Sequence, residues 1–555
     1  MTKVGEQELL FVPLGGVGEI GMNLNLYGYG PREDHQWLMI DLGVAFGDPT
    51  MPGIDVVMAD PSFIEERRDN LLGLVLTHAH EDHLGAVHHL WERLRCPVWA
   101  TPFTARILDR KLAEANLRDK VPVTVTPLGS RFSIGPFDIE SIALTHSIPE
   151  PMALAIRTPA GTVTHTGDWK LDPDPVVGGK VDEDALERLG DEGVLAIVCD
   201  STNVLTPGTS GSEADLLVGL VEAIRGASGR VAVACFASNV ARLETIAKAA
   251  RTHGRDVVVA GRSLRRVIEA ARETGYLSEA GNFIHEEDAG HLPKDKTLIV
   301  CTGSQGEPRA ALSRMANDDH NHITLDRGDR VVFSSRVIPG NEVYINNLQN
   351  ALARKGCEIV TRKDAFVHVS GHPARDELTT MYRYIRPQIA VPVHGEHRHL
   401  TAHAELAGEC GVNRAFVLEN GHVLKLAPGE PGVVDVARAG RLALEGNRLV
   451  PLHGNLVGSR YRAMYNGMLV VTVVLNARGA LHDEPRFTSS GLLEAEKGMK
   501  DRLFGVVERA VETMNKRDRT NDEAAAEIIR IAVRRMFRQV LNKKPMTAVH
   551  LVRVR

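Results

Sequence analysis

The stretch Thr77-His78-Ala79-His80-Glu81-Asp82-His83 decides how this chain of 555 residues is interpreted. It follows the apolar run Leu72–Leu76 and precedes a segment with helical spacing, Leu84–Leu94, so its side chains are expected in a loop between a strand and a helix. Imidazole and carboxylate groups are ligands for zinc and similar metals. The first two histidines can reach one metal ion, and the aspartate and last histidine can reach a second. Two ions about 3.5–4 Å apart can activate one shared water.

This HxHxDH pattern resembles the active-site motif of the metallo-β-lactamase superfamily, and the resemblance implies further ligands. His146 would complete the first metal site, Asp168 would bridge the two metals, and His394 would complete the second site. Asp41 would orient a ligand imidazole without binding a metal itself. The resemblance implies two Zn²⁺ per subunit, with Mn²⁺ or Mg²⁺ able to serve in activity. The full set of implied metal ligands is His78, His80, Asp82, His83, His146, Asp168 and His394.

A long insertion separates two of these ligands, because Asp168 and His394 are 226 residues apart. Strand-like runs alternate with helical segments there, which predicts a parallel sheet covered by helices. Ser212 and Asp215 fit a capping box that opens the first helix. The expected strands are Val231–Cys235, Asp256–Ala260, Thr297–Cys301, Arg330–Phe333 and Cys357–Val360. The expected helices are Ser212–Ile224, Val240–Ala250, Leu264–Thr274, Glu307–Met315 and Glu342–Arg354.

An insertion at this place resembles the β-CASP nucleases, whose added domain clamps nucleic acid over the metals. Three segments are similar to motifs of that branch, namely Val198–Thr202, Val369–His372 and Pro392–His397. Within the insertion, Cys235–Asn239, Cys301–Pro308 and Ser335–Asn341 resemble the ribonuclease J family. This second resemblance covers essentially the whole chain. The implied fold class is α/β: a metallo-β-lactamase αββα sandwich with an inserted β-CASP parallel-sheet α/β domain and a small α+β C-terminal domain.

The domain boundaries expected from these patterns divide the chain into five segments. Residues 1–205 and 365–450 are the two parts of the metallo-β-lactamase domain, and residues 206–364 form the β-CASP domain. Residues 451–467 are a linker, and residues 468–555 form the C-terminal domain.

The resemblance implies a metal-dependent ribonuclease with 5′→3′ exonuclease and endonuclease activity, in which a water activated by two metals hydrolyses RNA phosphodiester bonds. Such an enzyme would act in RNA maturation, including rRNA processing, and in mRNA decay. His372 would stabilise the transition state or protonate the leaving oxygen, and Asp82 and Asp168 would share in catalysis. Asp200, like Asp41, would orient the metal ligands without binding a metal itself.

Five residues are candidates for contacts with RNA or phosphate. His368, Ser370 and Gly371 would hold a 5′-monophosphate, by resemblance. Ser304 and Gln305 lie in the glycine-rich stretch Gly303–Gly306, whose backbone N–H groups can face phosphates.

Three other functions are compatible with part of the sequence. A small-molecule metallo-hydrolase, such as a lactonase or thioesterase, explains the histidine motif but leaves the insertion and His372 without a role. A β-CASP DNA nuclease shares the motifs, and only Ser304–Glu307 and Val337–Gly340 favour RNA. A non-catalytic RNA-binding scaffold would have lost ligands, whereas every implied ligand is present here.

A glycine motif near the N-terminus invites a different interpretation. Gly16, Gly18 and Gly21 match the dinucleotide-binding pattern GxGxxG, and Asp41 follows at the spacing of a ribose-binding acid. That chemistry needs a helix directly after the glycines to hold the pyrophosphate. Residues Met22–Gly30 alternate like a strand instead, so we expect the glycines to form tight turns.

Charge is distributed unevenly along a chain whose formal net charge is −6. Lys500–Arg555 contains 14 Lys or Arg against 7 Asp or Glu, which indicates either an acidic partner or a solvated helix face. This end combines a strand-like run (Met468–Leu475), amphipathic helical patterns (Leu492–Met514 and Ile528–Val540) and a final alternating strand (Ala548–Val554). It is expected to bind RNA or to mediate assembly. By resemblance, the partners would be a second copy, in a homodimer or homotetramer, and degradosome components.

Composition and cysteine usage indicate the class of protein and its cellular location. Charged residues make up 25% and hydrophobic residues 43%, as in ordinary globular proteins. No apolar run approaches the roughly 18 residues of a membrane span, and Met1–Glu8 lacks the apolar core of a signal peptide. The six cysteines form no CxxC pair, so disulfides are not expected. A cytoplasmic protein without a membrane partner is therefore predicted.

Overall fold

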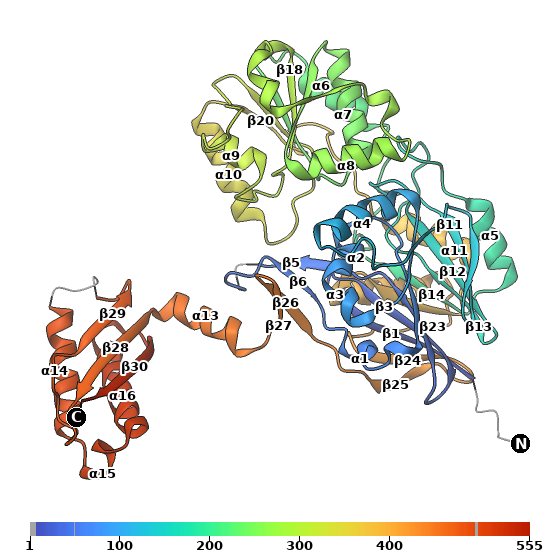
Figure 1. Cartoon of the computed structure of the whole chain (residues 1–555). Helices are drawn as coiled ribbons and strands as arrows, with labels where there is room; N and C mark the ends of the chain where they lie inside the picture. Colours follow the sequence, from blue (N-terminus) through green and yellow to red (C-terminus); the bar gives the residue numbers. More distant parts are fainter. Residues whose placement is uncertain (1–6, 49, 494–497, 555) are drawn as a thin grey trace, which may run out of the picture. The chain divides into compact units, whose positions relative to one another are not determined.

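The computed structural model describes residues 7–48, 50–493 and 498–554 (Figure 1). The N-terminal segment that bears on a signal peptide lies mostly outside these residues. The chain divides into two compact units. The first contains the described residues up to 45 together with 56–441, and the second contains 46–55 and those from 442 onward.

Two β-sheets form the frame of the first unit. One runs in the order β25 (Gly432–Val436), β24 (His422–Ala427), β1 (Gln7–Gly15), β3 (Leu24–Pro31), β4 (Gln36–Ile40), β7 (Leu71–Val75), β8 (Val98–Ala100), β9 (Val123–Val125). The other runs in the order β10 (Arg131–Ile134), β11 (Phe137–Ala143), β12 (Met152–Thr158), β13 (Gly161–His165), β14 (Ala196–Asp200), β21 (Ile389–Val393), β23 (Arg414–Ala415).

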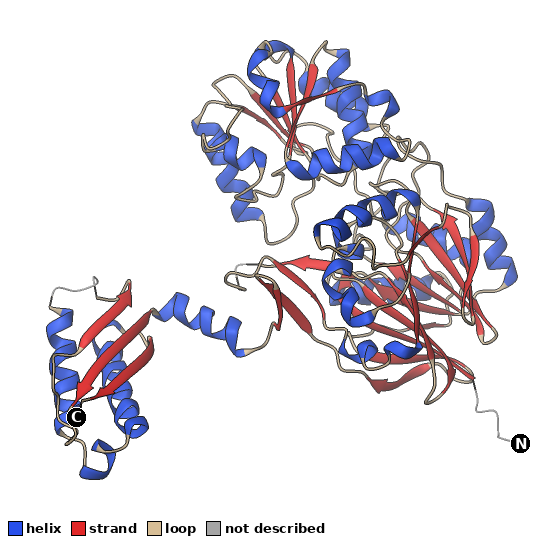
Figure 2. Ribbon diagram, viewed as in Figure 1, coloured by secondary structure: helices blue, strands red, loops and turns tan. Residues whose placement is uncertain are grey.

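The two sheets pack face to face and helices cover their outer faces (Figure 2). Leu38 and Val75 of the first sheet share a core with Leu154 and Val198 of the second, and all four are fully buried. The outer face of the second sheet is covered by α5 (Glu183–Glu192), α11 (Arg375–Ile385) and α12 (His397–Glu409). On the other side lie α1 (Ser62–Glu65), α2 (Glu81–Leu84), α3 (Val87–Leu94) and α4 (Pro102–Glu114). This αββα arrangement confirms the predicted fold class.

The insertion leaves the second sheet after β14 and returns to it at β21, which pairs with β14 in parallel register. Its own parallel sheet runs in the order β17 (Phe283–His285), β16 (Asp256–Ala260), β18 (Thr297–Cys301), β15 (Val231–Ala234), β19 (Arg330–Phe333), β20 (Glu358–Val360). Its helices are α6 (Leu216–Ile224), α7 (Val240–Thr252), α8 (Arg262–Glu273), α9 (Ala311–Ala316) and α10 (Glu342–Arg354). The predicted alternation is therefore confirmed.

Three local predictions were wrong in detail. The helix expected over Leu84–Leu94 is broken at Gly85, between α2 and α3. α6 begins at Leu216, and Asp215 makes no side-chain cap. The Ser212 hydroxyl instead donates to Asp172 at 2.6 Å, because the loop before α6 is held by a tertiary contact and not by a local cap. The helix expected from Glu307 begins only at Ala311.

Arg242 joins four segments of the insertion at a fully buried point. Its guanidinium forms a two-pronged pair with Glu213, with Nε 2.5 Å from Oε1 and Nη2 3.1 Å from Oε2. Nη1 donates to the carbonyl and hydroxyl oxygens of Ser334 at 2.7 and 2.8 Å, and to the carbonyl of Val367 at 3.3 Å. The segments that enter and leave the insertion are thus tied to α7 and to the end of β19.

Replacing Arg242 with alanine is expected to lower the free energy of unfolding by about 3–5 kcal/mol, because Glu213 would remain buried without its partner. Urea unfolding followed by circular dichroism measures the change. Arg354→Ala, which removes an exposed arginine from α10, is the matched control and should change stability by less than about 0.5 kcal/mol. Equal transition midpoints for the two variants would show that the pair contributes nothing.

The second unit is built on a sheet in the order β29 (Arg486–Ser490), β28 (Met468–Leu475), β30 (Met546–Arg553). One face packs against α14 (Met499–Glu512) and α16 (Asp522–Leu541). The strand predicted at Met468–Leu475 is confirmed, whereas Leu492 precedes α14 and is not part of it. The stretch expected to be a linker contains α13 (Asn455–Asn466). Most of the apolar arc of α16 packs within the unit, and Ile531 remains exposed.

The glycine-rich segment near the N-terminus forms turns, as predicted. Gly16, Gly18 and Gly21 all have positive φ, and β3 follows them in place of a helix. A Cβ on Gly16 would lie 2.2 Å from the side-chain oxygen of Asn23, so only glycine fits there. Among the residues that the structure describes, no helix combines the length and apolar character of a membrane span.

Candidate metal centre

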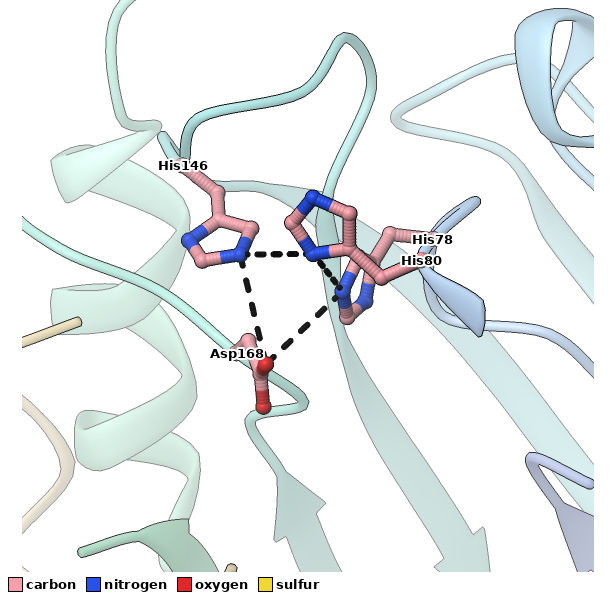
Figure 3. Close-up of side chains that lie close together, drawn as sticks. All are labelled: His78, His80, His146 and Asp168. Carbon is pink, nitrogen blue, oxygen red and sulfur yellow. Dashed lines mark hydrogen bonds and ion pairs between the residues drawn. The ribbon is translucent and has the colours of Figure 1, made fainter. Parts of the chain in front are cut away.

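Three overlapping groups of His and Asp side chains converge where strands of both sheets end, and two of them consist of the predicted metal ligands. The first consists of His78, His80, His146 and Asp168, whose side chains point toward one another in Figure 3. The second consists of Asp82, His83, Asp168 and His394. Within each group, the possible ligand atoms all lie within 4.8 Å of one another. The structure thus brings together all seven residues named as metal ligands, and Asp168 belongs to both groups.

Hydrogen bonds orient the ring of His78. The Thr77 hydroxyl donates its proton to Asp41 at 2.8 Å, so its oxygen is left to accept from Nδ1–H of His78 at 3.0 Å. Nε2 of His78 then carries a lone pair, and this atom lies 3.0 Å from Nδ1 of His80.

The rings of His83 and His146 are fixed in the same way. Nδ1–H of His83 donates to Asp41 at 2.7 Å, and Nδ1–H of His146 donates to the carbonyl of Gly371 at 2.5 Å. Nε2 of His146 therefore points into the cluster as an acceptor, and Nε2 of His83 lies 3.2 Å from Oδ2 of Asp168. A neutral imidazole held by its other nitrogen is the usual form of a histidine ligand.

The donor set fits divalent metal ions. Nε2 of His146 lies 3.1 Å from Nδ1 of His80, so the imidazole nitrogens of His78, His80 and His146 converge. Few protons are available for hydrogen bonds between these nitrogens. Asp168 Oδ1 is buried and has no hydrogen bond of good geometry, although Nδ1 of His394 lies 2.9 Å away. A cation between these atoms would satisfy both the lone pairs and the carboxylate.

The electrostatics of the two groups agree with this fit. Burial lowers the pKa of His78 and His146 well below the usual value and that of His80 to about 4, so all three are neutral. Burial opposes charge on His83 as well, but Asp168, Asp41 and Asp82 raise its pKa well above the usual value. The second group therefore has a field that favours positive charge.

Two residues of the centre adopt left-handed backbone conformations that side chains rarely take. Asp41 has φ +62° and His394 has φ +51°. The backbone N–H of His394 donates to the carbonyl of Gly16 at 2.6 Å, and β2 (Val17–Gly18) pairs with β22 (Gly395–Glu396) beside it. The glycine turns thus hold His394 in place, and such strain is typical of functional sites.

His372 lies at the edge of this centre, on the segment that returns from the insertion. Its Nδ1 is 2.8 Å from Oδ2 of Asp200 and 3.8 Å from Oδ2 of Asp168. Burial opposes its charge, but Asp200 and Asp168 raise its pKa above the usual value. Asp200 is fully buried, and His372 keeps 22% of its side chain exposed. With Nδ1–H donated to Asp200, the ring has only Nε2 left for other partners.

The candidates for RNA contacts lie at two places. Ser370 Oγ accepts from the Asn203 side chain at 2.7 Å and from the backbone N–H of His372 at 3.2 Å, so its own proton is left to donate. Gln305 is nearly buried and bonds within the protein, to the Arg336 carbonyl at 2.7 Å and the Ile338 N–H at 2.9 Å. Ser304 is also buried.

Sequence analysis missed several residues that support the centre. Thr77 binds Asp41 through both its N–H and its hydroxyl, and Asn23 donates to the Asp82 carbonyl at 3.0 Å. Asn203 joins Ser370, the His372 carbonyl and Arg336. Thr77 and Asn203 adjoin recognised motifs, which was the only signal available in the sequence.

Gly371 approaches His146 too closely to carry a side chain. A Cβ at this position would lie 2.8 Å from both Cε1 and Nδ1 of the imidazole. Gly371→Ala is therefore expected to displace His146, which lowers metal content and reduces cleavage about 10–100-fold. Metal analysis and initial rates measure both effects, and Gly408→Ala on α12, where a Cβ meets nothing, is the control. Unchanged metal content in Gly371→Ala would contradict this role.

Comparisons with known proteins agree with the fold and the centre. The family models that match are the beta-lactamase superfamily domain (50–196), the ribonuclease J beta-CASP domain (228–352), the Zn-dependent metallo-hydrolase RNA specificity domain (356–418) and the ribonuclease J C-terminal domain (456–554). Ribonuclease J of Sinorhizobium meliloti is 46% identical over 552 residues, which cover 99% of this chain and 98% of that protein.

More distant relatives share the name. Ribonuclease J of Corynebacterium glutamicum is 41% identical over 90% of this chain and 69% of its own length. That of Mycobacterium tuberculosis is 37% identical over 98% and 96%. Fold, centre and matches define a metal-dependent nuclease of the metallo-β-lactamase superfamily, with a β-CASP insertion. The chain belongs to the ribonuclease J family.

Proposed function

We propose that this protein is a ribonuclease with 5′→3′ exonuclease and endonuclease activity, which acts in the cytoplasm in rRNA maturation and mRNA decay. The observation that carries the proposal is the His372–Asp200 pair beside the metal centre. A lactonase or thioesterase on the same scaffold would leave that pair, and the inserted domain, without a purpose.

The metal cofactor is proposed to be two Zn²⁺ per subunit, with Mn²⁺ or Mg²⁺ able to support activity. His78, His80, His146 and Asp168 would hold one ion, and Asp82, His83, Asp168 and His394 the other. When bound, two such ions supply positive charge for a phosphodiester and lower the pKa of a shared water. The chain itself provides neutral imidazoles at the first site and a negative field at the second.

His372 is proposed to act as the general acid. Asp200 accepts from Nδ1–H and raises the pKa of the ring, despite the opposing effect of burial, so a second proton is held on Nε2. That proton can pass to the leaving oxygen of the cleaved bond, a role worth about 10²–10⁴-fold in rate. The proton held at His372 would return from solvent, since the side chain is partly exposed.

A 5′-monophosphate is proposed to bind at His368, Ser370 and Gly371. Nδ1 of His368 is buried and has no hydrogen-bond partner among the described residues. Burial, and then the nearby cations Arg242, Arg362, Arg336 and Lys170, lower its pKa well below the usual value. The His368 ring is therefore neutral, and the positive charge of these four side chains favours an anion beside it. Ser370 can donate its hydroxyl proton to the same anion.

Ser304 and Gln305 are proposed to serve the binding of RNA outside this phosphate site. Gln305 would do so by holding the loop around Arg336.

Digestion of matched substrates tests this function at single-nucleotide resolution. The substrates are 5′-monophosphate RNA, 5′-hydroxyl RNA of the same sequence, matched DNA and a thioester. Stepwise release of nucleotides from the 5′ end, faster for the monophosphate RNA, is the expected result. Faster cleavage of DNA would favour a β-CASP DNA nuclease. Hydrolysis of the thioester alone would favour a small-molecule hydrolase.

The five-segment division of the chain remains our proposal for its domains, with the C-terminal domain from residue 468 as the assembly element. This domain would join copies into a homodimer or homotetramer and could contact degradosome components. The sheet face opposite α14 and α16 carries partly exposed Val470 and Val474 on β28 and 47% exposed Val552 on β30. An apolar sheet face of this kind is suited to a second copy.

Truncation before Met468 is expected to give smaller assemblies and weaker activity without loss of metal, because no proposed ligand lies beyond His394. Size-exclusion chromatography with light scattering measures the assembly, and metal analysis of the same fractions is the control. An unchanged assembly state would exclude the assembly role. If RNA affinity then fell with a shallower salt dependence, the basic C-terminal surface would instead bind RNA.

A further inference from the structure

A cavity of about 790 Å³ lies at the carboxyl ends of β15, β16 and β18 of the inserted domain, and Glu114 of α4 also lines it. Phe236, Gly261, Gly303 and Ser304, which follow these strands, contribute to its wall. None of the residues that line it belongs to the two metal-binding groups. Its volume is within the range of small-molecule sites, roughly 300–1,000 Å³.

The topology of the parallel sheet opens a crevice at this place. After β16 the chain enters α8, which packs beside α7 on one face of the sheet. After β18 it enters α9, which packs with α10 on the opposite face, against Ala260, Cys301 and Phe333. Helices cover both faces in Figure 2. Adjacent strands whose connections diverge in this way create the switch point at which open α/β sheets bind ligands.

The wall of the cavity is positive, in contrast to the net charge of −6 for the chain. Five arginines line it against three glutamates. Arg265 is paired with Glu286 and Arg266 with Glu114. Arg262 and Arg309 are exposed, and neither forms an ion pair with any described residue. Two guanidinium groups are thus available to an anion.

Backbone groups add to this positive field. α8 starts at Arg262, directly at the cavity, and the backbone N–H of its N-cap residue Gly261 donates to Oε2 of Glu286 at 3.2 Å. The N–H groups of its first turn and the helix dipole favour negative charge there, and Glu286 meets part of this preference. Phe236, half-buried in the same wall, offers a flat apolar surface.

We propose that this cavity binds a nucleoside 5′-phosphate, with the phosphate between Arg262, Arg309 and the first turn of α8, and the base beside Phe236. The site is separate from the metal centre and does not depend on the cleavage chemistry proposed there. A single nucleotide fits a cavity of this volume.

Equilibrium dialysis of the full-length holoenzyme with radiolabelled AMP tests the proposal. The variant Arg262→Ala/Arg309→Ala is expected to bind one AMP fewer per chain, or to bind it at least about tenfold more weakly, because two charge-assisted contacts are lost. Cleavage of a short RNA at saturating concentration should stay unchanged. Arg354→Ala, elsewhere on the same domain, is the matched control.

Hydrogen exchange of the unmodified protein gives a second, independent measurement. AMP should slow exchange in the first turn of α8 and in residues 303–309, and inorganic phosphate should do so more weakly. Equal AMP binding by the double variant and the unmodified protein, without protection of α8, would overturn the proposal. Reduced affinity for an RNA oligonucleotide with unchanged AMP binding would also overturn it, and would assign the cavity to the RNA path.

Discussion

Replacing His394 with alanine is expected to abolish cleavage and to remove at least one of the two metal ions. The ring contacts Asp168 through Nδ1 at 2.9 Å and Asp82 through Nε2 at 3.2 Å, and it is almost completely buried. Without it the second group retains one imidazole and two carboxylates, and one of these carboxylates, Asp168, is shared with the first group, so the ion loses one of its two imidazole ligands and is held more weakly. The rate should fall by more than the 10–100-fold that is typical when only a supporting residue of a metal ligand is lost. His78→Ala and Asp82→Ala should behave alike.

Plasma emission spectroscopy of the purified variant measures the metal directly, and initial rates on 5′-monophosphate RNA measure the activity. His89→Ala is the matched control, because this histidine is half-buried on α3 and lies against His88, with ring centroids 3.8 Å apart, outside both metal-binding groups. It should keep full metal content and near-normal rates. Full metal content in His394→Ala would show that His394 is not a ligand.

The architecture could be predicted because its signals are local. Asp256–Ala260, Thr297–Cys301 and Glu342–Arg354 have the bounds that apolar periodicity gives them. The ligand residues follow strands, and strand ends of neighbouring β14 and β21 meet at one edge, which brings Asp200 beside His394. Pattern and resemblance together therefore indicated which side chains would converge.

Other features depend on contacts between distant segments, which a single sequence does not reveal. Gly371, which remains a proposed phosphate contact, also has a carbonyl that holds His146, 225 residues away in the chain. Gln305 suggested an RNA contact, but its amide holds a neighbouring loop. Ser212 suggested a local cap, whereas it binds Asp172. In each case the side chain or carbonyl has a tertiary partner that its neighbours in the sequence do not indicate, and at Ser212 this partner replaces the predicted cap.

Replacing His372 with alanine is expected to reduce the rate of RNA cleavage by about 10²–10⁴-fold while both metal ions are retained. The residue lies within reach of Asp168 and His394, so a structural role is the competing explanation. A substrate with a bridging sulfur at the leaving position distinguishes the two, because a thiolate leaves without a proton. If His372 donates that proton, the defect of His372→Ala should largely disappear with the sulfur substrate. Asp200→Asn, which keeps the shape but weakens the hold on Nδ1, should show a smaller defect of the same kind. An equal loss on both substrates, or a fall in metal content, would instead make His372 a support for the metal ligands.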